Sequence, residues 1–218
     1  TLSKTATQFK GYENYIFTNP ASDFSSSTIE LYEGKLDDQG KVTFNMKIPV
    51  AKDAPGMLRA SISCNVYEPG GDVSLYNQAI PFSTFSSYVG INFNQRNKYY
   101  YFETDVDNVF DIFTLDPDGK PIHRSDLEYK IYNIGWSWWW EHDDESFSSY
   151  LHSASVKPVA SGKLNTVNGK GQIKFKVDYP DWGRYLVYVK DRESEHATGG
   201  TIYVDWPDWR GRSNQSDP

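Results

Sequence analysis

Alternation of apolar and polar residues is the feature that most limits how this chain can fold. The apolar residues recur at every second position in six short runs, at residues 42–48, 58–66, 127–131, 173–177, 185–189 and 202–206. A period of two indicates a β-strand with one face on a core and the other in water. No segment shows a sustained 3.6-residue apolar period, so we predict an all-β chain.

Turn-forming residues separate these runs. Asp116-Pro117-Asp118-Gly119 has proline and glycine where a β-turn favours them, and Asn168-Gly169 is a tight-turn dipeptide. Many short strands joined by such turns predict antiparallel β-sandwiches of the immunoglobulin-like or fibronectin-like type.

The sequence also repeats itself over a long distance. Gly34-Lys35-Leu36 recurs as Gly162-Lys163-Leu164, 128 positions later, and Gly56 recurs as Gly183, 127 positions later. A repeat of this length indicates duplicated domains rather than a solenoid.

The two copies differ in how many residues precede the repeated motif. The second copy has 73 residues from Val89 to Ser161, whereas the first has only 33 from Thr1 to Glu33. We therefore expect two tandem sandwiches, over residues 1–83 and 84–218, the first lacking its N-terminal strands and leaving an edge for another element to cover. The junction, residues 81–87, is short and contains no glycine, which favours packed domains.

Charge and composition exclude several classes of function. The chain has 22 basic and 29 acidic residues, and no basic block, so it is a poor candidate for nucleic-acid binding. Aromatic residues make up 16% of it, which is typical of a folded chain. No apolar run approaches the roughly 20 residues of a membrane-spanning helix. The single cysteine, Cys64, excludes an internal disulfide, and its place in an alternating run predicts a buried, inert thiol.

Several motifs, in their order and spacing, resemble the bacterial alpha-2-macroglobulin family, and in particular its macroglobulin domains. The segments that carry the resemblance are residues 9–15, 81–85, 88–91, 113–121, 136–140, 182–186, 199–201 and 205–207. They include Leu115-Asp116-Pro117-Asp118-Gly119-Lys120-Pro121 and Trp182-Gly183-Arg184-Tyr185-Leu186. Together they extend over essentially the whole chain.

The resemblance implies a fragment of a periplasmic or cell-envelope inhibitor that traps an endopeptidase after cleavage of a bait segment. Many members form a thioester within a Cys-x-Glu-Gln motif, but Cys64 is followed by Asn65 and Val66, so that chemistry is not expected here. The implied role is a non-catalytic scaffold without a cofactor. Its partners would be neighbouring domains of the parent chain and, through the full-length protein, proteases.

A second function remains open, that of an adhesive or carbohydrate-binding immunoglobulin-like module of a bacterial cell-surface protein. On a strand, Trp136, Trp138 and Trp140 would share one face, where they would either stack on sugar rings or fill a core or a domain interface. We favour the structural interpretation, because tryptophan is a largely buried residue type.

The sequence contains only incomplete motifs for a metal or catalytic site, so no catalytic, cofactor or metal residue is assigned. Residues 141–145 are acidic with one histidine and predict a solvated loop. Asp116 and Asp118 resemble the start of a calcium loop, but the twelfth position holds Leu127 instead of glutamate. The other acids considered are Asp105, Asp107 and Asp111, and the histidines, which lack metal-site spacing, are His123, His142, His152 and His196.

Overall fold

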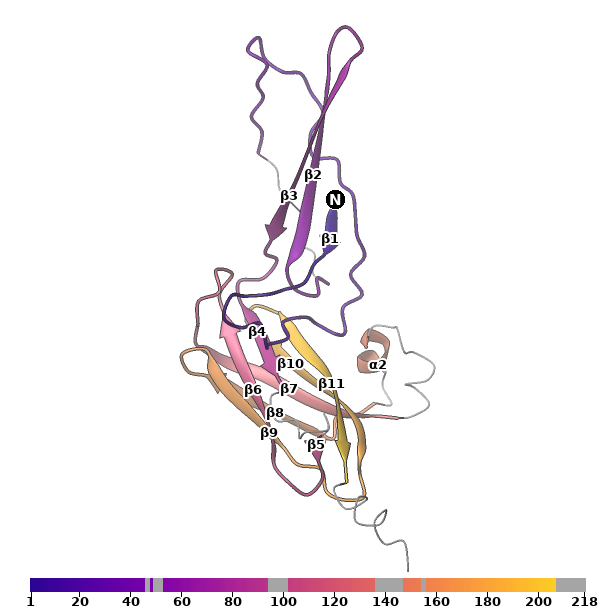
Figure 1. Cartoon of the computed structure of the whole chain (residues 1–218), viewed down its shortest axis with the longest axis vertical. Coiled ribbons are helices and arrows are strands. Elements are labelled where there is room, and N and C mark those ends of the chain that lie inside the picture. The colour runs from indigo at the N-terminus through magenta and orange to yellow at the C-terminus, as the bar shows by residue number, and fades with distance from the viewer. Residues whose placement is uncertain (46–47, 49–52, 94–101, 136–146, 154–155, 207–218) are drawn as a thin grey trace, which may run out of the picture.

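The computed structural model describes residues 1–218 except 46–47, 49–52, 94–101, 136–146, 154–155 and 207–218. It shows a narrow sheet formed by the N-terminal third of the chain, standing on a wider β-sandwich (Figure 1). The prediction of an all-β chain with antiparallel sheets is confirmed. The described residues also include one short helix, α2 (Ser148–His152).

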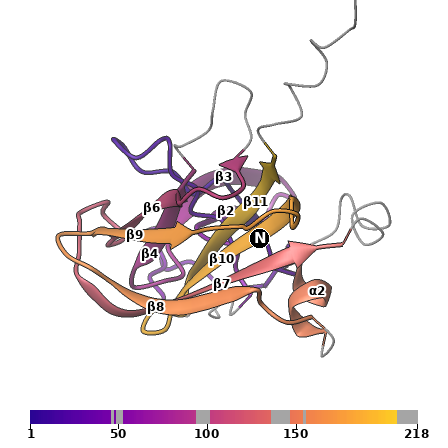
Figure 2. The same cartoon turned by 90° about the horizontal axis from the view of Figure 1, so that it is seen from below.

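The second domain is a two-sheet sandwich. One sheet has the order β5-β11-β10-β7-β8 and the other the order β4-β6-β9. The strands are β4 (Tyr88–Asn92), β5 (Phe102–Glu103), β6 (Asn108–Leu115), β7 (Arg124–Ile134), β8 (Ala160–Thr166), β9 (Lys170–Phe175), β10 (Gly183–Asp191) and β11 (Ala197–Asp205). Figure 2 shows the two layers from below.

The alternating residues of both sheets meet in one core. Ile131 of β7, Val187 of β10 and Ile173 of β9 are almost completely buried there, together with Phe110 of β6. Since each strand buries every second residue, this core accounts for the alternation at 127–131, 173–177 and 185–189.

The first domain is a single three-stranded sheet, with the order β1-β2-β3, in the described residues. Its strands are β1 (Leu2–Lys4), β2 (Leu58–Tyr67) and β3 (Val73–Phe82). The repeat is confirmed in the strand register, because Leu2 pairs with Ala60 just as Ile131 pairs with Val187. The sheet β1-β2-β3 is therefore the counterpart of β7-β10-β11.

The predicted strand at residues 42–48 is wrong for its described part, because Val42 and Phe44 lie outside any strand. Their repeat counterpart is β9, which pairs only with β6. Among the described residues, the first copy has no strand that corresponds to β6. A strand needs a neighbour for its backbone hydrogen bonds, and alternation alone does not provide one.

The prediction that Cys64 is buried is also wrong. Cys64 is exposed, and nine of the ten residues of β3 beside it are exposed as well. The upper part of the β2–β3 hairpin has no opposing sheet in the described residues, so both of its faces meet solvent.

We expect Cys64 in the folded protein to react with N-ethylmaleimide about as fast as in the urea-unfolded chain. The reason is that an exposed thiol needs no opening of the structure before it reacts. Mass spectrometry of a timed alkylation measures this rate. Protection of Cys64 until the chain unfolds would contradict the structure.

Candidate functional site

The largest group of interacting side chains in the described structure lies where the two domains meet. This contact region is here called the junction. Residues 9–20, here called the docking segment, leave the first domain and run along the second (Figure 1). Ile16 and Ile91 of β4 exchange two backbone hydrogen bonds, of 2.8 and 3.0 Å. Further along, the carbonyl of Pro20 accepts a hydrogen bond from the N–H of Phe147, 3.0 Å away. The docking segment thus occupies the outer edge of β4.

Aromatic rings fill the space between the docking segment and the sandwich. Phe9 and Phe17 meet edge to face with ring centroids 4.9 Å apart, and Phe9 meets Tyr88 at 5.4 Å. All three are buried and join Phe113 in one apolar cluster. Such pairs add specific geometry to the hydrophobic gain.

Gly90 of β4 leaves room for the Phe17 ring because it has no side chain. A Cβ atom at position 90 would lie 2.5 Å from Cε1 of Phe17, closer than packed carbon atoms can approach. The glycine therefore allows the ring to lie directly on the backbone of β4. This close approach fixes the docking segment against the strand.

His196 lies in the middle of the junction and is completely buried. Its Nδ1 accepts a hydrogen bond from the N–H of Val89, 3.1 Å away, so Nδ1 carries no proton. Its Nε2 therefore carries the proton and donates to the carbonyl of Phe17 at 3.0 Å. Burial lowers the pKa of His196 from 6.5 to about 3, against smaller opposing effects of Phe17 and Asp191. The imidazole is neutral and joins the two domains.

Beside His196, Asp191 at the end of β10 is a buried anion with several partners. Its Oδ2 accepts hydrogen bonds from the hydroxyl of Ser87 at 2.6 Å and from Nε of Arg124 at 3.1 Å. Its Oδ1 accepts one from the N–H of Glu193 at 2.9 Å. Burial by itself would raise the pKa of Asp191, but the hydrogen bonds from Ser87, Glu193 and Ser194 hold it below its ordinary value. The carboxylate thus connects three parts of the chain: the segment between the domains (residues 81–87, here called the linker), β7 and the β10–β11 turn.

The linker between the domains is fixed by hydrogen bonds to both of them. The hydroxyl of Thr84 donates to the carbonyl of Gly56 in the first domain, 2.9 Å away. Ser83 Oγ lies 2.7 Å from the hydroxyl of Tyr88 in the second. The expectation that the domains pack against each other is confirmed by these contacts.

The candidate residues from the sequence do not form a separate site in the described structure. Asp116 accepts backbone hydrogen bonds from Asp118 and Lys120, each within 2.9 Å, and so forms the predicted β-turn. Asp105 accepts from the N–H of Tyr179, and Asp111 from Nε2 of Gln172. His123 contacts the carbonyl of Thr166, and His152 Nδ1 lies 2.7 Å from the carbonyl of Ser148. No group of three possible metal ligands is found in the part that the structure describes.

Residues 136–146, with Trp136, Trp138, Trp140 and the acidic stretch 141–145, lie outside the described residues. The junction residues His196, Asp191 and Ser87 were not identified from the sequence as a site. His196 and its partner Phe17 are 179 positions apart, and no local spacing indicates such a contact.

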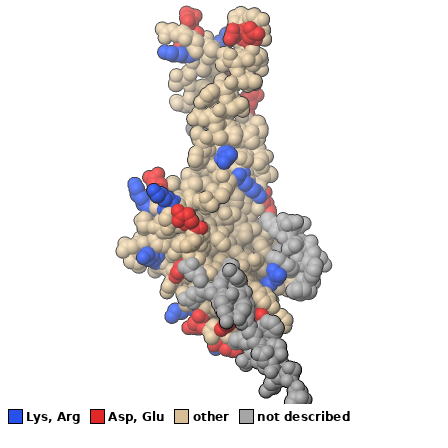
Figure 3. All heavy atoms as spheres, viewed as in Figure 1, with Lys and Arg blue, Asp and Glu red and all other residues tan. Residues whose placement is uncertain are grey.

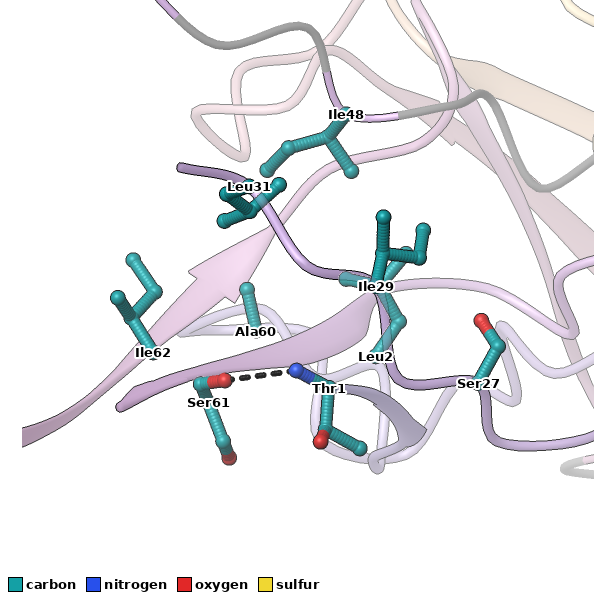
Figure 4. Close-up of a pocket in the computed structure, with 9 residues that line it drawn as sticks. All are labelled: Thr1, Leu2, Ser27, Ile29, Leu31, Ile48, Ala60, Ser61 and Ile62. Carbon is teal, nitrogen blue, oxygen red and sulfur yellow. Dashed lines mark hydrogen bonds between the residues drawn. The ribbon is translucent and has the colours of Figure 1, made fainter. Parts of the chain in front are cut away.

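The first domain has a small apolar hollow in its described residues. A small hollow beside β1 and β2 has a volume of about 30 Å³, about the size of one water molecule. In Figure 4 the aliphatic side chains of Ile29, Leu31 and Ile48 lie above Ala60 there. In Figure 3 acidic and basic side chains are interspersed on the visible face. No helix among the described residues is long and apolar enough to span a membrane.

Two tandem β-domains that pack against each other define a class of multidomain β-protein. The chain belongs to the bacterial macroglobulin domain family. Bacterial macroglobulin domain 6 matches residues 90–206, more than half of the chain, and the bacterial alpha-2-macroglobulin MG5 domain matches residues 1–73. The resemblance seen in the sequence is thereby confirmed.

Solved structures of alpha-2-macroglobulins share this fold. The trypsin-activated protein from Escherichia coli matches with a TM-score of 0.57 and 16% identity over 95% of this chain and 14% of that one. Its native conformation gives 0.54 and 17% over 94% and 13%. The Salmonella protein reacted with methylamine gives 0.53 and 17% over 95% and 14%. The chain thus spans about a seventh of their length. No curated protein sequence matches the chain.

Proposed function

We propose that this chain is a non-catalytic scaffold segment of a bacterial alpha-2-macroglobulin-like endopeptidase inhibitor. The observation that carries the proposal is the junction, in which backbone, aromatic and buried polar contacts hold two macroglobulin domains together. Such a unit passes a movement at one end to the other, because packed interfaces deform little. A protease trap that rearranges after bait cleavage needs segments of this kind.

The partners that fit this role are the neighbouring domains of the parent chain and, through the full-length protein, proteases. Support comes from the family membership and from the exposed sheet of the first domain. The equivalent face of β7 and β10 is covered by the second sheet of its own sandwich. We place the parent protein in the periplasm or cell envelope, as the family resemblance implies, and the domain boundary at residues 83 and 84. Two observations support that boundary, the end of β3 at Phe82 and the unmatched residues 74–89 between the two family matches.

The test uses the full-length parent protein and several unrelated endopeptidases. Each protease is assayed on a large protein substrate and on a small peptide, with and without the parent. A trap lowers cleavage of the large substrate while cleavage of the small peptide persists, because the enclosed enzyme stays active. If neither activity falls and the parent is merely degraded, the inhibitor function is wrong.

A further inference from the structure

His196 is the buried group of the junction whose chemistry is not explained by packing alone. An apolar side chain would fill the same space without needing two hydrogen bonds. The imidazole instead binds one group from each side of the interface, the Phe17 carbonyl of the docking segment and the Val89 N–H of β4. The ring also packs edge to face on Phe85 of the linker and on Tyr88, with centroids 4.9 and 4.8 Å away.

These two hydrogen bonds require one protonation state. A backbone N–H can only donate, so Nδ1 must offer its lone pair to Val89, and the single ring proton must sit on Nε2, facing Phe17. A proton taken from solvent onto Nδ1 removes that lone pair and sets two N–H donors against each other. It also places a full charge in a completely buried position, which is costly without a partner anion.

The groups around His196 do little to stabilise its protonated, charged form. Tyr88 of β4 packs on the His196 ring, and Asp191 at the end of β10 is the charged group that acts on it. Arg124 of β7 is paired with Asp191. Asp191 is the one anion among them, and its oxygens already accept from Ser87, Arg124 and the backbone of the β10–β11 turn. The docking segment contributes the carbonyl and ring of Phe17, and the linker contributes the Phe85 ring.

We propose that His196 is an acid-labile latch between the two domains, which holds the docking segment on β4 while neutral and releases it when protonated. In the closed junction the pKa of His196 is about 3, whereas in the open junction it returns to the ordinary 6.5 of an exposed imidazole. The lower value belongs to the closed state, so closure is fully favoured above pH 6.5 and is weakened as the pH falls below it. Linkage makes the open population rise about 25-fold between pH 7 and pH 5.

The latch is independent of protease inhibition, and its test uses this chain without any protease. Hydrogen exchange of the Ile16 and Ile91 amides, whose hydrogen bonds cross the interface, is measured from pH 7 to pH 5 and corrected for intrinsic exchange. The expected result is a fall in protection of about 25-fold. In H196Q, whose neutral amide offers one donor and one acceptor, protection should change less than about threefold over the same range.

Two results would overturn the latch. One is unchanged protection of Ile16 and Ile91 in the wild-type chain, and the other is an equal fall in H196Q, which would assign the effect to another group. If H196Q does not fold, nitrogen NMR of the His196 ring in the wild-type chain decides. The latch predicts the neutral Nε2–H form in the closed state down to pH 5, and charging of the docked ring near pH 6.5 contradicts it.

Discussion

Replacing Asp191 with alanine is expected to lower the free energy of unfolding by about 3 kcal/mol, the lower end of the range for breaking a buried ion pair. The Asp191 side chain is 2% exposed and that of Arg124 is 16% exposed, so the substitution leaves a largely buried cation. It also leaves the Ser87 hydroxyl and the Glu193 N–H without their acceptor. We choose the lower end because Arg124 also lies 3.5 Å from Glu193 at the surface.

Urea unfolding followed by circular dichroism measures this loss. The matched control is D118A, because Asp118 and Lys120 form an ion pair whose side chains are more than 70% exposed. We expect no measurable change from that control, since exposed ion pairs contribute little. A loss below about 1 kcal/mol for D191A would mean that Asp191 is not the organising anion of the junction.

The F17A substitution is expected to lower the free energy of unfolding by about 3–5 kcal/mol, the range found when a buried phenylalanine is truncated to alanine. Phe17 is 1% exposed, packs on Phe9 and lies directly against Gly90. The loss falls on the contact between the domains, so the docking segment should leave β4 while the sandwich core stays folded. Protection of the Ile16 and Ile91 amides should disappear before that of Val187 in β10.

The control for this prediction is F44A, at a phenylalanine that is 42% exposed and stacks on Tyr32 within the first domain. It should leave the exchange of Ile16 and Ile91 unchanged. If F17A also leaves their protection unchanged, the aromatic cluster does not hold the docking segment, and the rigid-junction account is wrong.

The sequence predicts most of the fold, because the sandwich follows from alternation. The runs at 127–131, 173–177 and 185–189 became β7, β9 and β10 since both sheets of the second domain are present to bury them. The same alternation failed at Val42 and Phe44 and at Cys64. In the part of the chain that the structure describes, the first two have no neighbouring strand, and no opposing sheet covers the hairpin that carries Cys64. Strand β3 was missed because its residues are nearly all exposed and its pairing with β2 determines it.

The junction was beyond sequence reasoning for a different reason. His196 has its partners 107 and 179 positions away, at Val89 and Phe17. Its role depends on the docking segment crossing to the second domain, and periodicity describes only neighbours along the chain. The family resemblance identified the domains but gave no role to this histidine.

If the two macroglobulin domains form one rigid unit, they share one orientation in solution, and residual dipolar couplings measure this. Backbone N–H couplings are measured in one weakly aligning medium at pH 7 for amides of β2 and β3 and for amides of β7, β10 and β11. A rigid junction predicts that a single alignment tensor fits both sets. Two tensors of different magnitude would show that the domains reorient independently, and would contradict the account.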